Sequence, residues 1–328
     1  MKRLQLSSFG APTDVVELAE IDPSDPGPGQ LAVSIEAAPI NPSDLNLIRG
    51  IYGVRPELPA ALGAEGVGRV IAVGEGVDGS RVGTRVLVVP TLEQATWREQ
   101  TVLDERNAVT VDLDGDPLQL AMLGINPITA YCLLHGYVKL APGAWVAQTG
   151  ASSATAGYVL ALAAHAGLRT LNVVRRAESV KPLLDAGADV VLVEGADLVK
   201  QASDALGDAS LELILDAVGG EPVAQLASLS KVEGQIVSYT ARARQPVTIP
   251  VVNLIFRGLS VHGYWVNLWL QRTARETVAQ TYHELATLVA DGTLAAPVEA
   301  TYALDDYREA ITHAARNDRN GKVLFALR

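Results

Sequence analysis

The stretch WVAQTGASSATAGYVLALAAHAGLRTLNVVRR, residues 145–176, decides the fold. It opens with an apolar run, passes through a turn of small residues, continues in an alanine- and leucine-rich segment of helical length, and ends in a second apolar run. A strand, a helix and another strand in this order favour a parallel pair of strands, because the crossover has to pack back onto the sheet. We interpret this stretch as the first βαβ unit of a nucleotide-binding domain.

The same alternation continues downstream. Further strands are expected in DVVLV, LELILDAV and QIVSY, and helices are expected around residues 155–166, 178–187, 197–206 and 221–230. Repeated units of this length form a doubly wound parallel sheet with helices on both faces. The sequence therefore predicts an α/β domain that binds a dinucleotide.

Small residues fill the turn between the first strand and its helix. In a dinucleotide fold this turn holds the pyrophosphate on free backbone N–H groups, and small side chains allow a close approach. The glycines do not follow the GxGxxG spacing, but the serine and threonine hydroxyls can donate to phosphate. The alternative is a turn that only packs the helix on the sheet. The predicted cofactor-binding residues are Gly150, Ala151, Ser152, Ser153, Ala154 and Thr155.

Two arginines, Arg175 and Arg176, close the second strand of this unit, and no acid follows until Glu178. Proteins that bind NAD place an acid at this strand end for the ribose 2′-hydroxyl, whereas an arginine accommodates a 2′-phosphate. A guanidinium group matches a phosphate in charge and geometry. The pair therefore predicts NADPH, and the alternative is two solvated arginines on a surface loop.

The sequence before this domain has a different pattern of apolar residues and glycines. From about residue 28 to residue 111, short Val/Ile segments alternate with glycine, as in GVGRVIAVGEGVDGSRVGTRVLVV, which indicates a compact, strongly bent, mostly antiparallel β-structure. After LSVHGYWV, an amphipathic helix is expected at about 271–290, and a final strand is expected to return to the first domain. The predicted domains are a β-rich domain, residues 1–122 and 267–328, and a nucleotide-binding domain, residues 123–266.

Composition limits the partners and the location. The net charge of −11 and the pI near 5.0 disfavour nucleic acid. No run of about 18 apolar residues predicts a membrane span. The opening MKRLQLSSFG has no apolar signal core, and we find no Arg- and Ser-rich, acid-poor transit segment, so a cytoplasmic protein is expected.

Metal ligands are not indicated by the sequence. Its single cysteine, Cys132, excludes an internal disulfide and a four-cysteine zinc site. Cys132 and His135 lie in an apolar helical segment, where core packing is the better interpretation. Without a Lewis acid, hydride addition to an already polarised double bond is favoured over alcohol oxidation. The histidines that fall in no ligand spacing are His135, His165, His262, His283 and His313.

A family resemblance enters at INPSDLNLIRGIYGVRPELPAALGAEGVGRV, residues 40–70. This segment resembles the zinc-free medium-chain dehydrogenase/reductase superfamily, and most closely its mitochondrial-type 2-enoyl thioester reductase branch. The resemblance covers nearly the whole chain. It recurs in LGINPITAY (123–131), GLRTLNVVR (167–175), VVNLIFRGLSVHGYWVNLW (251–269) and GKVLFAL (321–327).

This resemblance implies a GroES-like catalytic domain, a Rossmann domain, NADPH and a homodimer. It implies that Tyr52 in GIYG stands near the nicotinamide as proton donor or orienter of the substrate. The alternative for Tyr52 is an aromatic residue that packs in a turn, and Trp265 and Trp269 could be core or dimer-contact aromatics rather than the border of the cleft. The other residues assigned to the active site or the cofactor are Asn41, Thr129, Tyr239 and Lys322.

The expected function is NADPH-dependent reduction of the C=C bond of an α,β-unsaturated carbonyl compound, most of all a 2-enoyl thioester. An NADPH:quinone oxidoreductase and a non-catalytic NADPH-binding protein remain alternatives, and an enone or a quinone remains an alternative substrate. A coenzyme A or carrier-protein thioester brings negative charge, for which Arg55, Arg242 and Arg244 are candidate partners. The LSVHGYWV segment is a candidate edge strand that pairs across a two-fold axis.

Overall fold

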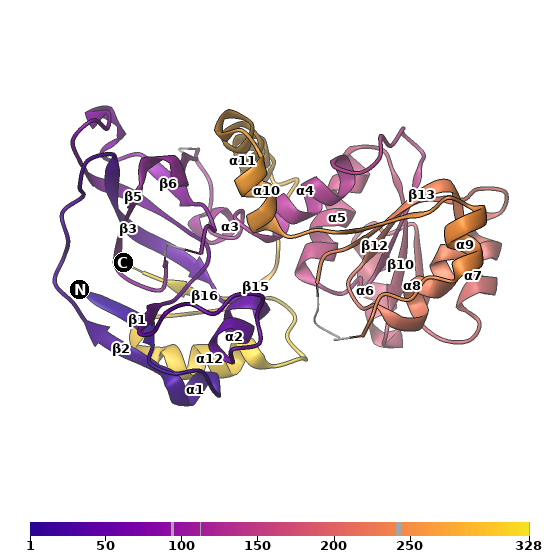
Figure 1. Ribbon diagram of the computed structural model, residues 1–328, viewed down its shortest axis with the longest axis horizontal. Coiled ribbons are helices and arrows are strands. Elements are labelled where there is room, and N and C mark those ends of the chain that lie inside the picture. Colours follow the sequence, from indigo (N-terminus) through magenta and orange to yellow (C-terminus); the bar gives the residue numbers. More distant parts are fainter. Residues whose placement is uncertain (93–94, 112, 241–244, 328) are drawn as a thin grey trace. The chain divides into compact units, whose positions relative to one another are not determined.

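A computed structural model describes residues 1–92, 95–111, 113–240 and 245–327 of the chain. The chain forms two compact units, shown in Figure 1. Unit 1 comprises Met1–Ile128 and Leu270–Arg328, and unit 2 comprises Thr129–Trp269. The chain thus leaves unit 1 once and returns to it. Within the described residues, no helix is both long and apolar enough to cross a membrane.

Unit 2 is built on one parallel sheet, whose strands follow the order β11-β10-β9-β12-β13-β14. The strand order reverses direction at β9, so this is the doubly wound sheet that the sequence predicts. The carboxyl ends of β9, β10 and β12 meet at one edge of the sheet, where such folds bind their ligands. The strands are β9 (Trp145–Thr149), β10 (Arg169–Val174), β11 (Val190–Val193), β12 (Leu211–Asp216), β13 (Ser230–Ser238) and β14 (Ser260–Gly263).

Helices cover the sheet of unit 2. One core lies where Leu198 and Ala202 of α7 and Val223 of α8 pack against apolar strand residues such as Ile214. The four helices predicted between the strands are all present, because each has apolar residues at helical spacing. The helices are α4 (Asn126–His135), α5 (Ala154–His165), α6 (Val180–Asp185), α7 (Leu198–Leu206), α8 (Gly220–Ala227) and α9 (Val251–Phe256).

Unit 1 contains a sheet in the order β15-β16-β3-β5-β6-β8, with β7 also paired to β3, and a second sheet in the order β2-β1-β4. All of these pairs are antiparallel except β15 with β16, as expected for the glycine-punctuated segment. The strands are β1 (Lys2–Leu6), β2 (Val16–Glu20), β3 (Gln30–Pro39), β4 (Ala60–Ala61), β5 (Gly66–Val73), β6 (Arg85–Val88), β7 (Gln100–Asp104), β8 (Ala108–Thr110), β15 (Val298–Tyr302) and β16 (Lys322–Ala326).

The helix predicted at about 271–290 is present as α11, and a separate helix, α10, precedes it. Helix α10 ends at Arg272 and α11 begins at Arg275, because Ala274 takes an extended conformation with ψ of 141° that interrupts the helical hydrogen bonds. The remaining helices are α1 (Pro12–Val15), α2 (Pro42–Ile48), α3 (Pro117–Leu120), α10 (Val266–Arg272), α11 (Arg275–Ala290) and α12 (Tyr307–Ala315).

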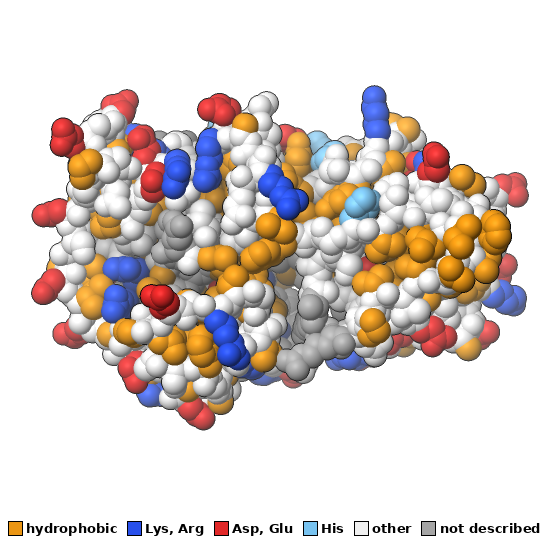
Figure 2. Space-filling view, viewed as in Figure 1, with side chains coloured by type: hydrophobic (Ala, Val, Ile, Leu, Met, Phe, Trp, Pro, Cys, Tyr) orange, Lys and Arg blue, Asp and Glu red, His pale blue; other side chains and the backbone are white. Residues whose placement is uncertain are grey.

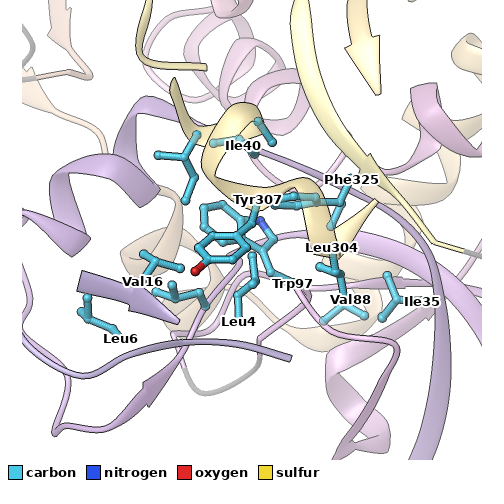
Figure 3. Packing of buried hydrophobic residues seen from close by; sticks show 14 of the residues in the cluster. Leu4, Leu6, Val16, Ile35, Ile40, Val88, Trp97, Leu304, Tyr307 and Phe325 are labelled. Atoms are coloured by element: carbon cyan, nitrogen blue, oxygen red, sulfur yellow. The ribbon is translucent and has the colours of Figure 1, made fainter. Parts of the chain in front are cut away.

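An aromatic core joins segments of unit 1 that are far apart in the sequence (Figure 3). The rings of Trp97 and Phe325 meet edge to face with centroids 5.4 Å apart, and Trp97 Nε1 donates to the Pro39 carbonyl at 3.1 Å. β16 pairs with β3 so that Leu324 lies opposite Pro39. Continued by two residues, this register brings Lys322 beside Asn41.

Candidate functional site

The turn after β9 has the geometry of an anion site. Gly150 has a φ of 61°, in the left-handed region that favours glycine, and Ala151 is fully buried. Ser153 caps α5, and its Oγ accepts from the Ala156 N–H at 3.2 Å. Other N–H groups of the first turn of α5 have no partner within the helix, and the helix dipole there favours negative charge. This end of unit 2 therefore suits a phosphate group.

Asp216, at the end of β12, ties this turn to the neighbouring strand. Its Oδ1 accepts from Thr149 Oγ1 at 2.8 Å and from the Gly219 N–H at 2.9 Å, and Thr149 Oγ1 in turn accepts from the Ala217 N–H at 2.9 Å. These bonds fix the carboxyl ends of β9 and β12 against each other. Sequence reasoning missed Asp216, although an acid that closes the apolar run LELILD is a visible signal.

Tyr239, directly after β13, carries a buried hydroxyl for which the described residues offer no hydrogen bond of normal geometry. Burial raises the pKa of Tyr239 to about 12, with Ser153 opposing and Asp216 adding to that shift. The hydroxyl is therefore a neutral donor close to the helix cap. A buried neutral donor beside this helix cap fits an acceptor such as a phosphate oxygen of a bound dinucleotide.

Arg175 and Arg176 are both exposed and follow β10 directly. Arg176 Nε lies 3.3 Å from Glu178 Oε1 in a solvent-exposed ion pair. A solvent-exposed ion pair contributes little to the free energy of folding, so the Arg176 guanidinium can exchange Glu178 for a phosphate group. Arg175 has no ion pair within the described part of the chain. The end of β10 thus offers two guanidinium groups to a phosphate: that of Arg175, and that of Arg176, which is held by one weak ion pair.

In unit 1 the structure brings together Asn41 and Lys322, which are 281 residues apart. Lys322 Nζ donates to Asn41 Oδ1, and Asn126 Nδ2 donates to the same oxygen at 3.3 Å. Asn41 Nδ2 donates to Glu65 Oε1 at 2.7 Å. The Asn41 side chain is therefore a buried amide that bridges an ammonium and a carboxyl group.

Two buried acids accompany this pair, and sequence reasoning missed both. Burial raises the pKa of Asp44 to about 6, against hydrogen bonds from Asn41 and the charge of Lys322. Burial also raises the pKa of Glu65 to about 8, with Lys322 opposing. The pKa of Lys322 is lowered by burial, which outweighs the raising effect of Glu65 and Asp44. The only signal in the sequence was the acid itself, in the segments NPSD (41–44) and GAEG (63–66).

Tyr52 lies half-buried in the turn that follows α2. Arg55 fixes this turn: its Nε and Nη2 donate to the Gly50 carbonyl at 3.0 and 2.8 Å, and its guanidinium lies 5.3 Å from the centroid of the Phe9 ring. Arg55 is one of the three candidate partners that the sequence offers for an acyl carrier. In the structure its guanidinium supports the turn that carries Tyr52.

Three further predicted site residues, Thr129, Trp265 and Trp269, belong to unit 2. Thr129 is buried in α4, while Trp265 and Trp269 are half-buried one helical turn apart, with the Trp269 N–H bonded to the Trp265 carbonyl at 3.2 Å. Arg242 and Arg244, the other candidates for acyl contacts, lie outside the described residues.

Two family models match the chain. The alcohol dehydrogenase GroES-like domain matches residues 27–149, and the zinc-binding dehydrogenase model matches residues 155–286. The zinc of the second name does not fit this chain, because no three His, Cys, Asp or Glu side chains gather as possible ligands in the described residues.

Curated relatives span the whole chain. This chain is 35% identical over 316 residues to the mitochondrial enoyl-[acyl-carrier-protein] reductase of Rattus norvegicus. The aligned region covers 95% of this chain and 84% of the relative. The protein of the same name from Bos taurus is 35% identical over 333 residues, covering 100% and 89%. These relatives are named mitochondrial, so the expectation of a cytoplasmic protein is wrong.

A solved structure extends the comparison to three dimensions. The Etr1p/NADP/crotonyl-CoA complex is 25% identical to this chain, with a TM-score of 0.83 and 99% of each chain covered. It is similar in fold over both units, and the curated relatives share the sequence from end to end. The chain belongs to the enoyl-[acyl-carrier-protein] reductase family, within the medium-chain dehydrogenase/reductase superfamily.

Proposed function

We propose that this protein reduces the C2=C3 double bond of 2-enoyl thioesters with NADPH. The observation that carries the choice of NADPH is Arg175, an exposed guanidinium without an ion pair in the described residues, at the strand end where an acid would select NAD. Support comes from the names of the relatives and from the NADP and crotonyl-CoA of the Etr1p complex.

Unit 2 would hold the cofactor. The turn Gly150–Thr155 and the Tyr239 hydroxyl would bind the pyrophosphate, and Arg175 with Arg176 would bind the 2′-phosphate. When bound, NADPH supplies a hydride for the β-carbon of the enoyl group. Thr129, Asn41 and Lys322 are proposed to stand at the nicotinamide end.

Tyr52 is proposed to deliver the proton that completes the reduction. Addition of a hydride to the β-carbon leaves negative charge on the thioester oxygen and the α-carbon, so a nearby O–H donor stabilises the enolate and then protonates carbon. Positioned proton transfer of this kind contributes roughly 10²- to 10⁴-fold in rate. The Arg55–Gly50 bonds keep the turn of Tyr52 in place, and Trp265 is proposed to border the acyl group.

We further propose a homodimer that forms through unit 2. The described strands end with β14 at one side of the sheet, and an open edge of this kind pairs readily with another strand. The helix that precedes β14 in the chain, α9, exposes Val251, Val252, Leu254, Ile255 and Phe256. Apolar side chains gather over the position of α9 at the right of Figure 2. Phe256 is 79% exposed, and a patch of this kind marks an interface.

Oxidation of NADPH by the purified protein can be measured as the loss of NADPH absorbance. The acceptors to be compared are 2-enoyl thioesters of coenzyme A, 2-enoyl thioesters of acyl carrier protein, free enones and quinones. We expect the highest kcat/KM with an enoyl thioester. Preference for a quinone would replace the proposal with the oxidoreductase alternative. Tight NADPH binding without turnover of any acceptor would identify a non-catalytic protein.

A further inference from the structure

The buried cluster of unit 1 holds more ionisable groups than the proposed reaction uses. Asn41 and Lys322 have roles at the cofactor, but Asp44 and Glu65 have none, although they are only 6% and 0% exposed. A buried charge costs several kcal/mol unless it is paired and hydrogen-bonded. The burial of Asp44 and Glu65 therefore indicates that each carboxyl group has a specific role.

The hydrogen bonds define how the Asn41 amide is oriented. Its Oδ1 receives the ammonium of Lys322, which can only donate, and its Nδ2 faces Glu65 Oε1. A flipped amide would set Nδ2, which is a donor, against the ammonium of Lys322, which has no acceptor. Asp44 Oδ2 fixes the backbone of the same residue by accepting from the Asn41 N–H at 2.8 Å.

The charges around Lys322 come from three groups. Glu65 and Asp44 raise the pKa of Lys322, while burial, the largest effect, and Arg319 lower it. On Glu65 the opposing groups are Lys322, the Asn41 amide and the Ile125 backbone N–H, while Asp44 adds to the effect of burial. Without the two carboxyl groups, burial and Arg319 would act on Lys322 unopposed.

We propose that Glu65 and Asp44 are positioning residues, which keep Lys322 in its ammonium form and hold the Asn41 amide in one orientation between that cation and Glu65. The acids act through Asn41 and Lys322 and touch neither substrate nor cofactor. The inference rests on the proposed function in one respect, that Asn41 and Lys322 serve the cofactor end of the reaction.

The direct test is the titration of Lys322 by NMR of isotope-labelled lysine. The chain has six lysines, and Lys322→Met identifies the signal of this one. We expect Glu65→Gln, which keeps shape and removes charge, to lower the titration midpoint of Lys322 by about one pH unit or more. Glu65→Asp, which keeps the charge on a shorter chain, should lower it less. Asp44→Asn should also lower it.

Equal midpoints in the wild type, Glu65→Gln and Asp44→Asn would overturn the inference. So would a larger effect of Glu65→Asp than of Glu65→Gln, because that order indicates packing rather than charge. Circular dichroism checks that each variant folds. If Glu65→Gln does not fold, the comparison of Glu65→Asp and Asp44→Asn with the wild type still decides the question.

A kinetic readout separates this inference from the proposed function. In Glu65→Gln the basic limb of the kcat/KM profile with crotonyl-CoA should move to lower pH together with the Lys322 midpoint. If the wild type reduces enoyl thioesters while the midpoints are equal, only the present inference fails. If the wild type reduces none of them, the proposed function fails, and the NMR titration still tests the role of the acids.

Discussion

At the scale of single residues, the pair Arg175 and Arg176 is proposed to determine the choice of cofactor. Replacing both by Ala should weaken NADPH binding by a factor of ten or more, because each charge-assisted hydrogen bond to phosphate contributes about 1.5–3 kcal/mol. NADH binding should change little. Fluorescence titration with both nucleotides measures this difference.

A matched control lies at the other end of the same strand. Arg169 stacks on the Trp145 ring at 4.1 Å and pairs with Asp189, so Arg169→Ala removes a unit 2 arginine without touching the proposed phosphate site. Equal losses of NADPH and NADH affinity in the double variant would refute the assignment of the 2′-phosphate.

Tyr52→Phe tests proton delivery. Removal of the hydroxyl should lower kcat with crotonyl-CoA by roughly 10²-fold or more and leave NADPH affinity nearly unchanged. Steady-state kinetics and nucleotide titration measure both. Tyr302→Phe is the control, because that hydroxyl bonds to His313 at 2.9 Å in the same unit. Unchanged turnover in Tyr52→Phe would show that the residue only packs in its turn.

The residues also show the limit of sequence reasoning. Asn41 and Lys322 were found by resemblance, and the β3–β16 register explains why they meet. Asp44 and Glu65 were missed because an acid in a polar stretch is normally solvated, and only the tertiary fold buries it. The ion pair of Arg176 with Glu178 could not be predicted from the sequence either, because it depends on the side-chain conformations after the end of β10.

At the scale of elements, the strand–helix alternation of unit 2 was predictable, because parallel strands are continuous apolar runs and helices such as α7 carry an apolar stripe, here Leu198, Ala202 and Leu206. The break at Ala274 was not, since the apolar spacing continues across it. The β-rich segment was recognised as antiparallel, but the order in which its strands pair was beyond sequence reasoning. Pairing depends on contacts distant in sequence, such as Trp97 with Phe325.

The α5 cap gives a prediction for an element. Ser153→Ala removes the acceptor of the Ala156 N–H and should cost about 1 kcal/mol of unfolding free energy, measured by urea denaturation. NADPH affinity should fall as well, because the hydroxyl stands in the proposed phosphate turn. Ser153→Thr retains a hydroxyl and serves as control. A variant with wild-type stability and affinity would exclude both roles.

At the scale of the whole molecule, the surface of unit 2 predicts self-association. Replacing Ile255 and Phe256 of α9 by Glu should convert a dimer into a monomer, because two charges from each protomer would be buried in an apolar interface. Analytical ultracentrifugation measures the mass. The control is Leu184→Glu, an exposed apolar residue of α6. A monomeric wild type, or a double variant that stays dimeric, would contradict the proposed interface.

The central claim concerns the whole molecule as a catalyst, and the fate of the transferred hydrogen tests it most directly. The protein is incubated with crotonyl-CoA and NADPH that carries deuterium at both positions of C4 of the nicotinamide, and the butyryl product is analysed by mass spectrometry and NMR. We predict one deuterium at the β-carbon and a solvent-derived hydrogen at the α-carbon. A butyryl product without deuterium, or no reduction of crotonyl-CoA while NADPH is bound, would contradict the account.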